Sequence, residues 1–187
     1  MTRAGVLSPL PPARTGVADY TRDLVPHQAR LEDLALYAPG PVPGELEGVP
    51  VRPLSELERD PPATLYYHMG NNPQHGWVYD QALKRPGVVV LHDLVLHHFY
   101  IDRTLAPGDK PAYFELVEAV GGMPGYRLGQ GLADGVCTQL QLFFMPLFER
   151  IVAASRGVVV HNRRAARLIR EGGDPRRERQ QCGDGEA

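Results

Sequence analysis

The run Val88-Val89-Val90-Leu91 is the feature that most limits how this chain folds. It is short and entirely apolar, and it ends abruptly at His92-Asp93. Such a run predicts a strand that is buried on both faces, as in a parallel sheet covered by helices. Open α/β sheets bind their ligands beyond the carboxyl ends of the strands. The sequence therefore predicts that His92 and Asp93 lie where such a sheet binds a ligand.

Strand patterns and helix patterns alternate along the rest of the chain. Apolar or β-branched runs predict strands over residues 4–7, 34–37, 49–52, 64–68, 87–91 and 157–160. Apolar residues at helical spacing predict helices over 17–30, 76–84 and 162–170, with two or three more helices between 110 and 153. This alternation indicates the α/β class, with a parallel sheet and helices on both faces.

The domain organisation follows from where this alternation stops. We expect one domain over residues 1–171 and a disordered polar tail over 172–187, because the segment from Gly173 onward contains no aliphatic residue. Residues 140–151 are so apolar that we expect them to be largely buried. Phe143, Phe144, Met145, Leu147 and Phe148 within that segment are expected in the core or at an interface.

Composition narrows the functional classes. The chain has 187 residues, of which 43% are hydrophobic, and a formal net charge of -2, which suits one soluble domain with a sizeable core. The balanced charge gives no support for nucleic acid or an anionic membrane as a partner. No window holds the ~20 apolar residues that a membrane span needs. Two cysteines give no disulfide framework, so we expect a reducing, cytoplasmic setting.

A proline-rich loop after the first predicted strand ends at Arg14-Thr15-Gly16. Thr15 is suited to cap the next helix, and a glycine at a helix start lets a ligand approach the backbone closely. Free amide groups at a helix N-terminus attract phosphate, and Arg14 adds a cation. Gly16 and Arg14 are therefore candidate phosphate ligands. The alternative is a glycine that serves the turn alone.

Polar residues also follow two other predicted strands. Asn71 and Asn72 come after the strand that ends at His68, and their amides suit sugar hydroxyls or, alternatively, a tight turn. His161 and Asn162 follow the last strand. They are expected to line the same crevice, while Asn162 also suits a helix cap.

The residues around His92 allow more than one interpretation. Its neutral imidazole at a strand end is suited to hydrogen-bond a ligand oxygen or to stabilise developing charge. A helix that began near Asp93 would put Asp93 and His97 on one face, at a spacing that suits metal ligands. Alternatively, Asp93 caps that helix and His97 or His98 is half-buried with its hydrogen bonds satisfied. No second pair with metal spacing is present in the sequence, so we expect no metal.

The order of these motifs resembles the N-terminal half of family-four glycosyltransferases of the GT-B fold. The resemblance lies in the segments 8–20 (Ser-Pro-Leu-Pro-Pro-Ala-Arg-Thr-Gly-Val-Ala-Asp-Tyr), 67–73 (Tyr-His-Met-Gly-Asn-Asn-Pro), 88–93 (Val-Val-Val-Leu-His-Asp) and 157–161 (Gly-Val-Val-Val-His). It covers about residues 3–170. It implies a Rossmann-like domain that binds the acceptor, facing a second domain that binds a nucleotide-sugar donor.

The resemblance also implies roles for single residues. Gly16 and Arg14 would lie by the donor diphosphate, and His92 would be the catalytic residue near the transferred sugar. The acceptor side or the crevice would be shaped by Asn71, Asn72, Asp93, His161 and Asn162. Asn162 departs from the serine that the family pattern predicts there.

The expected activity is hexosyl transfer, with retention of configuration, from a nucleotide-diphosphate sugar to a carbohydrate or lipid-linked acceptor. No cofactor is expected beyond that donor substrate. The chain corresponds to the acceptor half, with no paired-glutamate segment, so we expect it to be weakly active or inactive unless a second lobe or a second copy completes the site. Membrane contact would be peripheral at most. The alternatives are a non-catalytic sugar- or nucleotide-binding module from a truncated gene and a metal hydrolase that uses His92, Asp93 and His97.

Overall fold

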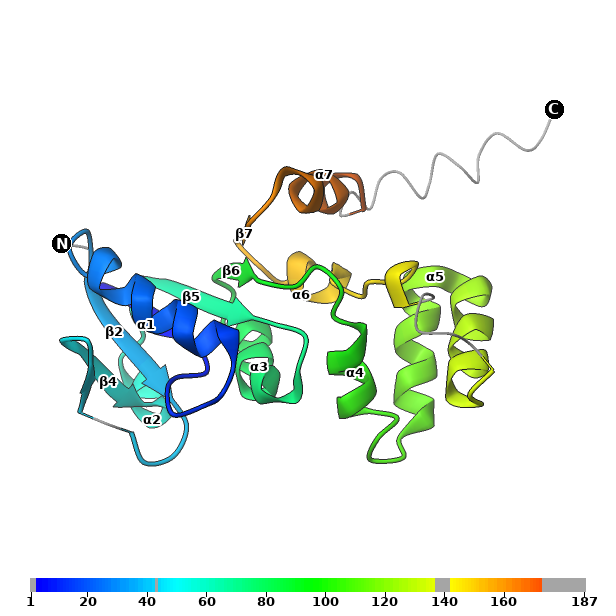
Figure 1. The fold of residues 1–187 in the computed structure, drawn as a ribbon, viewed down its shortest axis with the longest axis horizontal. Helices are drawn as coiled ribbons and strands as arrows, with labels where there is room; N and C mark the ends of the chain where they lie inside the picture. Colours follow the sequence, from blue (N-terminus) through cyan, green and yellow to red (C-terminus); the bar gives the residue numbers. More distant parts are fainter. Residues whose placement is uncertain (1–2, 43, 137–141, 173–187) are drawn as a thin grey trace.

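The computed structural model describes residues 3–42, 44–136 and 142–172 and contains one seven-stranded sheet (Figure 1). The strands are β1 (Arg3–Leu7), β2 (Asp33–Ala38), β3 (Glu45–Leu46), β4 (Val49–Pro53), β5 (Thr64–Met69), β6 (Val88–Leu91) and β7 (Gly157–Val160). The helices are α1 (Gly16–Gln28), α2 (Leu54–Arg59), the 3₁₀ helix η1 (Pro73–His75), α3 (Gly76–Lys84), α4 (His97–Arg103), α5 (Lys110–Ala133), α6 (Glu149–Ala153) and α7 (Arg163–Gly172).

The strand order is β3-β4-β2-β1-β5-β6-β7, and every neighbouring pair except β3–β4 is parallel. Without the short antiparallel β3, this is the order of a doubly wound, Rossmann-like sheet. The chain moves outward from β1 in one direction through β2 and β4, and in the other through β5, β6 and β7. The point of reversal therefore lies between β1 and β5, where sheets of this kind form a crevice at their carboxyl ends.

Alternate residues of the central strands pack into two separate cores. Ala4 and Val6 of β1 lie in one core together with Val25 of α1. Leu7 of β1 lies in the other core, with Leu57 of α2, and we call this the second core. Successive side chains of a strand point to opposite faces, so α1 covers one face of the sheet and α2 and α3 cover the other (Figure 1). The prediction of an α/β fold with a parallel sheet flanked by helices is confirmed.

The segment between β6 and β7 forms the helices α4, α5 and α6, which extend the second core beyond the sheet (Figure 1). α5 bends at Gly122, whose backbone (φ 59, ψ -152) is not helical. Gly125 follows one turn later, where an added Cβ would come within 2.3 Å of the Val117 carbonyl oxygen. The chain is therefore kinked at this glycine-rich segment, with helix on both sides.

Most predicted elements are confirmed within a few residues, and α3 has the predicted bounds. The sequence interpretation missed α2, α4 and the two-residue β3. The expectation that residues 140–151 are largely buried is wrong for Phe143 and Phe144, whose residues are 69% and 81% exposed, whereas Met145, Leu147 and Phe148 are buried. Buried and exposed side chains alternate here because the chain is not a continuous helix before α6.

The predicted tail and the predicted apolar segment both extend beyond the described residues. The predicted tail begins at residue 172, but Gly172 is the last residue of α7. Residues 173–187 lie outside the described residues, as do residues 140–141 of the apolar segment. Within the described ranges, no helix combines the length and apolar character that crossing a membrane requires.

Candidate functional site at the carboxyl edge of the sheet

Four loops meet at the carboxyl edge of the sheet, because β1, β5, β6 and β7 run parallel. The loop after β1 leads to Gly16 and α1, and the ends of β6 and β7 lead to His92 and His161. Tyr20, in the second turn of α1, connects these regions, because its ring lies 4.7 Å from that of His92 between centroids. The structure therefore brings the start of α1 and His92 together at one edge.

Three histidines form a continuous hydrogen-bonded chain at this edge. His68 Nδ1 lies 3.1 Å from His92 Nε2, and His92 Nδ1 lies 3.2 Å from His161 Nε2. We call His68, His92 and His161 the histidine chain. The central member uses both of its ring nitrogens.

Strand register explains why these three side chains meet. His68 pairs with Val90, and the pairing of β6 with β7 ends at Leu91 and Val160. His92 and His161 are therefore the next residues on adjacent strands. Since side chains alternate between faces, all three imidazoles lie on the face that α1 covers.

Tyr20 packs against every member of the histidine chain. Its ring centroid lies 5.7 Å from that of His68, 4.7 Å from that of His92 and 5.4 Å from that of His161. Aromatic rings at such separations attract each other in tilted or edge-to-face arrangements. Tyr20 thus limits the rotation of the imidazoles from the α1 side.

Burial keeps the inner part of the histidine chain neutral. It lowers the pKa of His68 to about 3, and the neighbouring His92 and His161 lower it further. Burial also lowers the pKa of His92 to about 4, followed by the effect of His161. A neutral imidazole carries one donor and one acceptor, so the hydrogen bonds of the chain must all run in the same sense.

Asp93 stabilises the loop after β5 by a hydrogen bond and does not cap α4. Its Oδ2 accepts a hydrogen bond from the Asn71 amide at 2.9 Å, and Asn71 Oδ1 accepts one from the Phe99 amide at 2.9 Å. Gly70 fits between these groups because a Cβ there would lie 2.8 Å from His75 Cε1 and 3.3 Å from Asp93 Oδ2. Asn71 and Asp93 therefore hold the β5 and β6 loops in place.

His75 lies behind this loop with one nitrogen unsatisfied. Its Nδ1 lies 3.1 Å from Asn72 Oδ1 and donates to it, because an amide oxygen only accepts. Its Nε2 is buried and has no hydrogen-bond partner in the part of the chain that is described. Burial lowers the pKa of His75, while Asn72 and Asp93 oppose that shift.

Two predicted asparagines have local capping roles. Asn72 Oδ1 accepts from the Gln74 amide at 3.0 Å, at the start of η1. Asn162 Oδ1 accepts from the Ala165 amide at 2.8 Å, at the start of α7. The turn interpretation of Asn72 and the cap interpretation of Asn162 are therefore confirmed. These hydrogen bonds use only the Oδ1 atoms and do not involve the side-chain NH₂ groups.

The start of α1 has the features of an anion site. Thr15 caps the helix through its side-chain oxygen, which accepts from the Ala18 amide at 3.0 Å. The Gly16 and Val17 amides donate to no residue in the described ranges. Arg14 is exposed, and it forms no ion pair with a described residue. Asp19 in the first turn is paired with Arg22 at 3.1 Å, which offsets its negative charge.

The Asp93–His97 pair of the alternative metal-site interpretation does not form. α4 begins at His97, so Asp93 lies in the preceding loop and does not share a helix face with His97. His97 is buried, with Nδ1 2.7 Å from the Met145 carbonyl oxygen and Nε2 2.6 Å from the Tyr113 hydroxyl. Among the described residues, no three His, Cys, Asp or Glu side chains are grouped to hold a metal ion. The interpretation of His97 as a satisfied buried histidine is confirmed.

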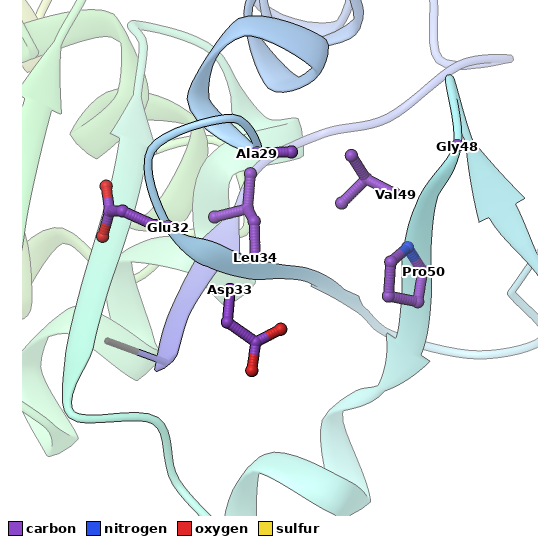
Figure 2. A pocket seen from close by; sticks show the side chains of 7 residues that line it. All are labelled: Ala29, Glu32, Asp33, Leu34, Gly48, Val49 and Pro50. Carbon is purple, nitrogen blue, oxygen red and sulfur yellow. The ribbon is translucent and has the colours of Figure 1, made fainter. Parts of the chain in front are cut away.

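Hollows on the surface lie at both edges of the sheet. Figure 2 shows one of about 420 Å³ at the amino end of β2, lined by Ala29, Glu32, Asp33, Leu34, Gly48, Val49 and Pro50. It is at the opposite edge from the histidine chain. A larger apolar hollow of about 710 Å³ adjoins the carboxyl edge, because Leu94 and Val95 of the β6 loop line it together with Phe143, Phe144 and Phe148.

Sequence interpretation missed three contributors to this edge. The sequence places His68 at a strand end without predicting a role for it, Tyr20 falls within the predicted helix over 17–30, and His75 carries no prediction. For His68 a signal exists, since it ends a predicted strand as His92 and His161 do. For Tyr20 and His75 the local sequence carries no comparable signal.

No protein-family model, no curated protein and no solved structure matches this chain.

Proposed function

We propose that this chain is the acceptor-side lobe of a retaining glycosyltransferase, which moves a hexosyl group from a nucleotide-diphosphate sugar to a carbohydrate or lipid-linked acceptor. The observation that carries the proposal is the neutral imidazole of His92 at the same sheet edge as the free amides of α1. A chain of imidazoles that is centred on His92 and ends at an exposed ring suits sugar hydroxyls, and a helix N-terminus suits a diphosphate.

Gly16 supports the diphosphate half of the proposal. No atom lies within 4 Å of a Cβ built on it, and its φ is not in the left-handed region. Neither packing nor backbone conformation therefore requires glycine at this position in the free chain. A ligand that approaches the backbone amides closely would explain why the residue here has no side chain.

His92 supports the sugar half. Its side chain is held from both sides by His68 and His161 and is covered by Tyr20, so its orientation is set before a ligand arrives. Such preorganised groups lower the barrier when charge develops on the reacting sugar ring. Contacts to the nucleotide base would come from a second lobe, because a GT-B site lies between two domains.

The Gly16 part is tested by titration calorimetry with UDP-glucose and GDP-mannose on the whole chain. Gly16→Ala is expected to leave thermal stability unchanged or slightly higher, because the site is open and alanine favours helix. It should weaken nucleotide-sugar binding by about tenfold or more, since the methyl group blocks close approach to the amides.

Gly157→Ala is the matched control. Gly157 starts β7 at the amino edge, and an added Cβ would meet only Val88 Cγ2 at 4.0 Å. This control should bind like the wild type. Equal affinity of wild type and Gly16→Ala would remove the diphosphate role of Gly16.

The His92 part is tested by comparing UDP-glucose with UDP. His92→Ala should abolish the extra affinity that the sugar contributes, leave the affinity for UDP nearly unchanged, and lower any hydrolysis or transfer by tenfold or more. Parallel urea denaturation measures stability. A loss of stability as large as the loss of binding would make His92 a core residue. Binding without hydrolysis or transfer by the wild type would favour a non-catalytic sugar- or nucleotide-binding module.

A further inference from the structure

His92 has no ring nitrogen left for a ligand in this arrangement. Nε2 faces His68 and Nδ1 faces His161, at 3.1 and 3.2 Å. A ligand that bonded directly to His92 would have to displace one of these neighbours. His68 is almost completely buried, at 1% exposure, and cannot move aside.

His161 is the exposed end of the histidine chain. Its Nε2 bonds to His92, while its Nδ1 makes no hydrogen bond to any residue in the described ranges. The ring is held on one side by Tyr20 and stacks obliquely on His92, with centroids 5.4 and 4.8 Å apart. His161 Nδ1 is therefore a positioned polar atom at the open edge of the site.

The sense of the hydrogen bonds links this atom to the buried end. If His161 Nε2 donates to His92 Nδ1, then His92 Nε2 donates to His68 and His161 Nδ1 is an acceptor. If His68 Nδ1 donates, every bond reverses and His161 Nδ1 becomes a donor. The chain thus offers either a donor or an acceptor at one fixed point, which suits a hydroxyl group, since a hydroxyl does both.

We propose that His161 contacts a hydroxyl group of the ligand through Nδ1, and that His92 and His68 are positioning residues that set its tautomer and orientation. The identity of the ligand as a sugar rests on the proposed function. The other ionisable groups around the chain are Asp93, which is bonded to the Asn71 amide, Tyr20, and His75.

Two substitutions separate the contact from the positioning. In His161→Gln the amide replaces Nε2 and keeps the bond to His92, but nothing replaces Nδ1. In His161→Asn the amide replaces Nδ1, but it is too short to reach His92. The residue is exposed, so both variants should fold.

The first measurement is ¹⁵N NMR of the imidazoles in the free, whole chain. His92 is expected to be a single neutral tautomer in the wild type and in His161→Gln, and a tautomer mixture in His161→Asn. A tautomer mixture in the wild type would overturn the positioning role. This measurement needs no ligand.

The second measurement is binding of UDP-glucose and GDP-mannose. His161→Gln should bind the better of the two about tenfold more weakly than the wild type. The affinity of His161→Asn should lie between those of the wild type and His161→Gln, because it keeps the contact and loses the positioning by His92. Tighter binding by His161→Ala would show that His161 shields His92, and would overturn the proposal. If His161→Gln binds as tightly as the wild type, this inference is overturned and the proposed function is not. If the wild type does not bind either nucleotide-sugar, the proposed function is overturned as well.

Discussion

His97 and His92 differ in what their ring nitrogens face. His97 donates from Nδ1 to the Met145 carbonyl, because a carbonyl oxygen only accepts, and so its Nε2 accepts from the Tyr113 hydroxyl. Both partners belong to the protein core. Each neighbour of His92 is another imidazole, able to donate or accept. In the first arrangement the core partners fix the tautomer of a single ring, and in the second the tautomers of the three rings are fixed relative to one another.

The His97 arrangement predicts the effect of Tyr113→Phe. The substitution removes the hydroxyl that donates to Nε2 and leaves a buried acceptor unsatisfied, which costs about 1–3 kcal/mol of unfolding free energy. Urea denaturation measures this loss. Tyr126→Phe is the control, because the Tyr126 ring contacts Phe114 and its hydroxyl makes no hydrogen bond to a described residue. Equal stability of wild type and Tyr113→Phe would mean that this bond contributes nothing to folding.

At the scale of elements, α7 depends on the residue that precedes it. Asn162 Oδ1 satisfies the Ala165 amide, and Ala165 is the buried residue of this helix. Gly172, at the other end, packs against Phe148, since a Cβ there would lie 3.5 Å from the Phe148 ring. The cap therefore helps to hold α7 against the rest of the second core.

Asn162→Ala should lower the unfolding free energy by about 1 kcal/mol, because the helix loses its N-cap. Asn162→Asp should retain most of the stability, since aspartate caps equally well. Chemical denaturation checks the stability, and hydrogen exchange of the α7 amides checks that the loss is local. If Asn162→Asp lost as much stability as Asn162→Ala, the cap would not be the cause.

The helices show what local sequence can and cannot predict. The prediction of α3 is right to the residue, because Gly76 and Lys84, its first and last residues, mark both limits. α4 is not among the predicted helices, and the conditional helix start near Asp93 lies too early, because the start of α4 at His97 is decided by distant contacts. The Leu96 amide bonds to the Pro146 carbonyl at 2.7 Å, and the Phe99 amide bonds to Asn71 Oδ1. No local pattern contains that information.

Over the whole molecule, buried histidines make stability dependent on pH. Burial lowers the pKa of His68 to about 3 and of His92 to about 4, and it also lowers the pKa of His75 and His97. In the unfolded chain these groups bind a proton near pH 6.5. Below that pH the unfolded state therefore binds more protons than the folded state, and stability falls.

We expect the melting temperature to be highest above about pH 6.5 and to fall steadily toward pH 4. Burial raises the pKa of Glu149, so this residue favours the folded state at low pH and opposes the effect of the histidines. The four histidines outnumber it. Differential scanning calorimetry across this range is the measurement. His68→Gln should give a flatter profile than the wild type. An equally steep profile in that variant would show that His68 is not the source of the acid sensitivity.

The sequence by itself determined the class of fold and the edge at which its polar residues gather. Apolar runs and helical spacing are local patterns, and parallel strands necessarily bring their carboxyl ends to one edge. The positions of Gly16, His92 and His161 at that edge follow from this rule. Only the tertiary structure decided which of these side chains touch. The contacts of His68, His92 and His161 depend on the registers of β5 with β6 and of β6 with β7, and the contact of Tyr20 depends on how α1 lies across them. Those registers are set by hydrogen bonds between residues far apart in the chain, so no local pattern predicts them.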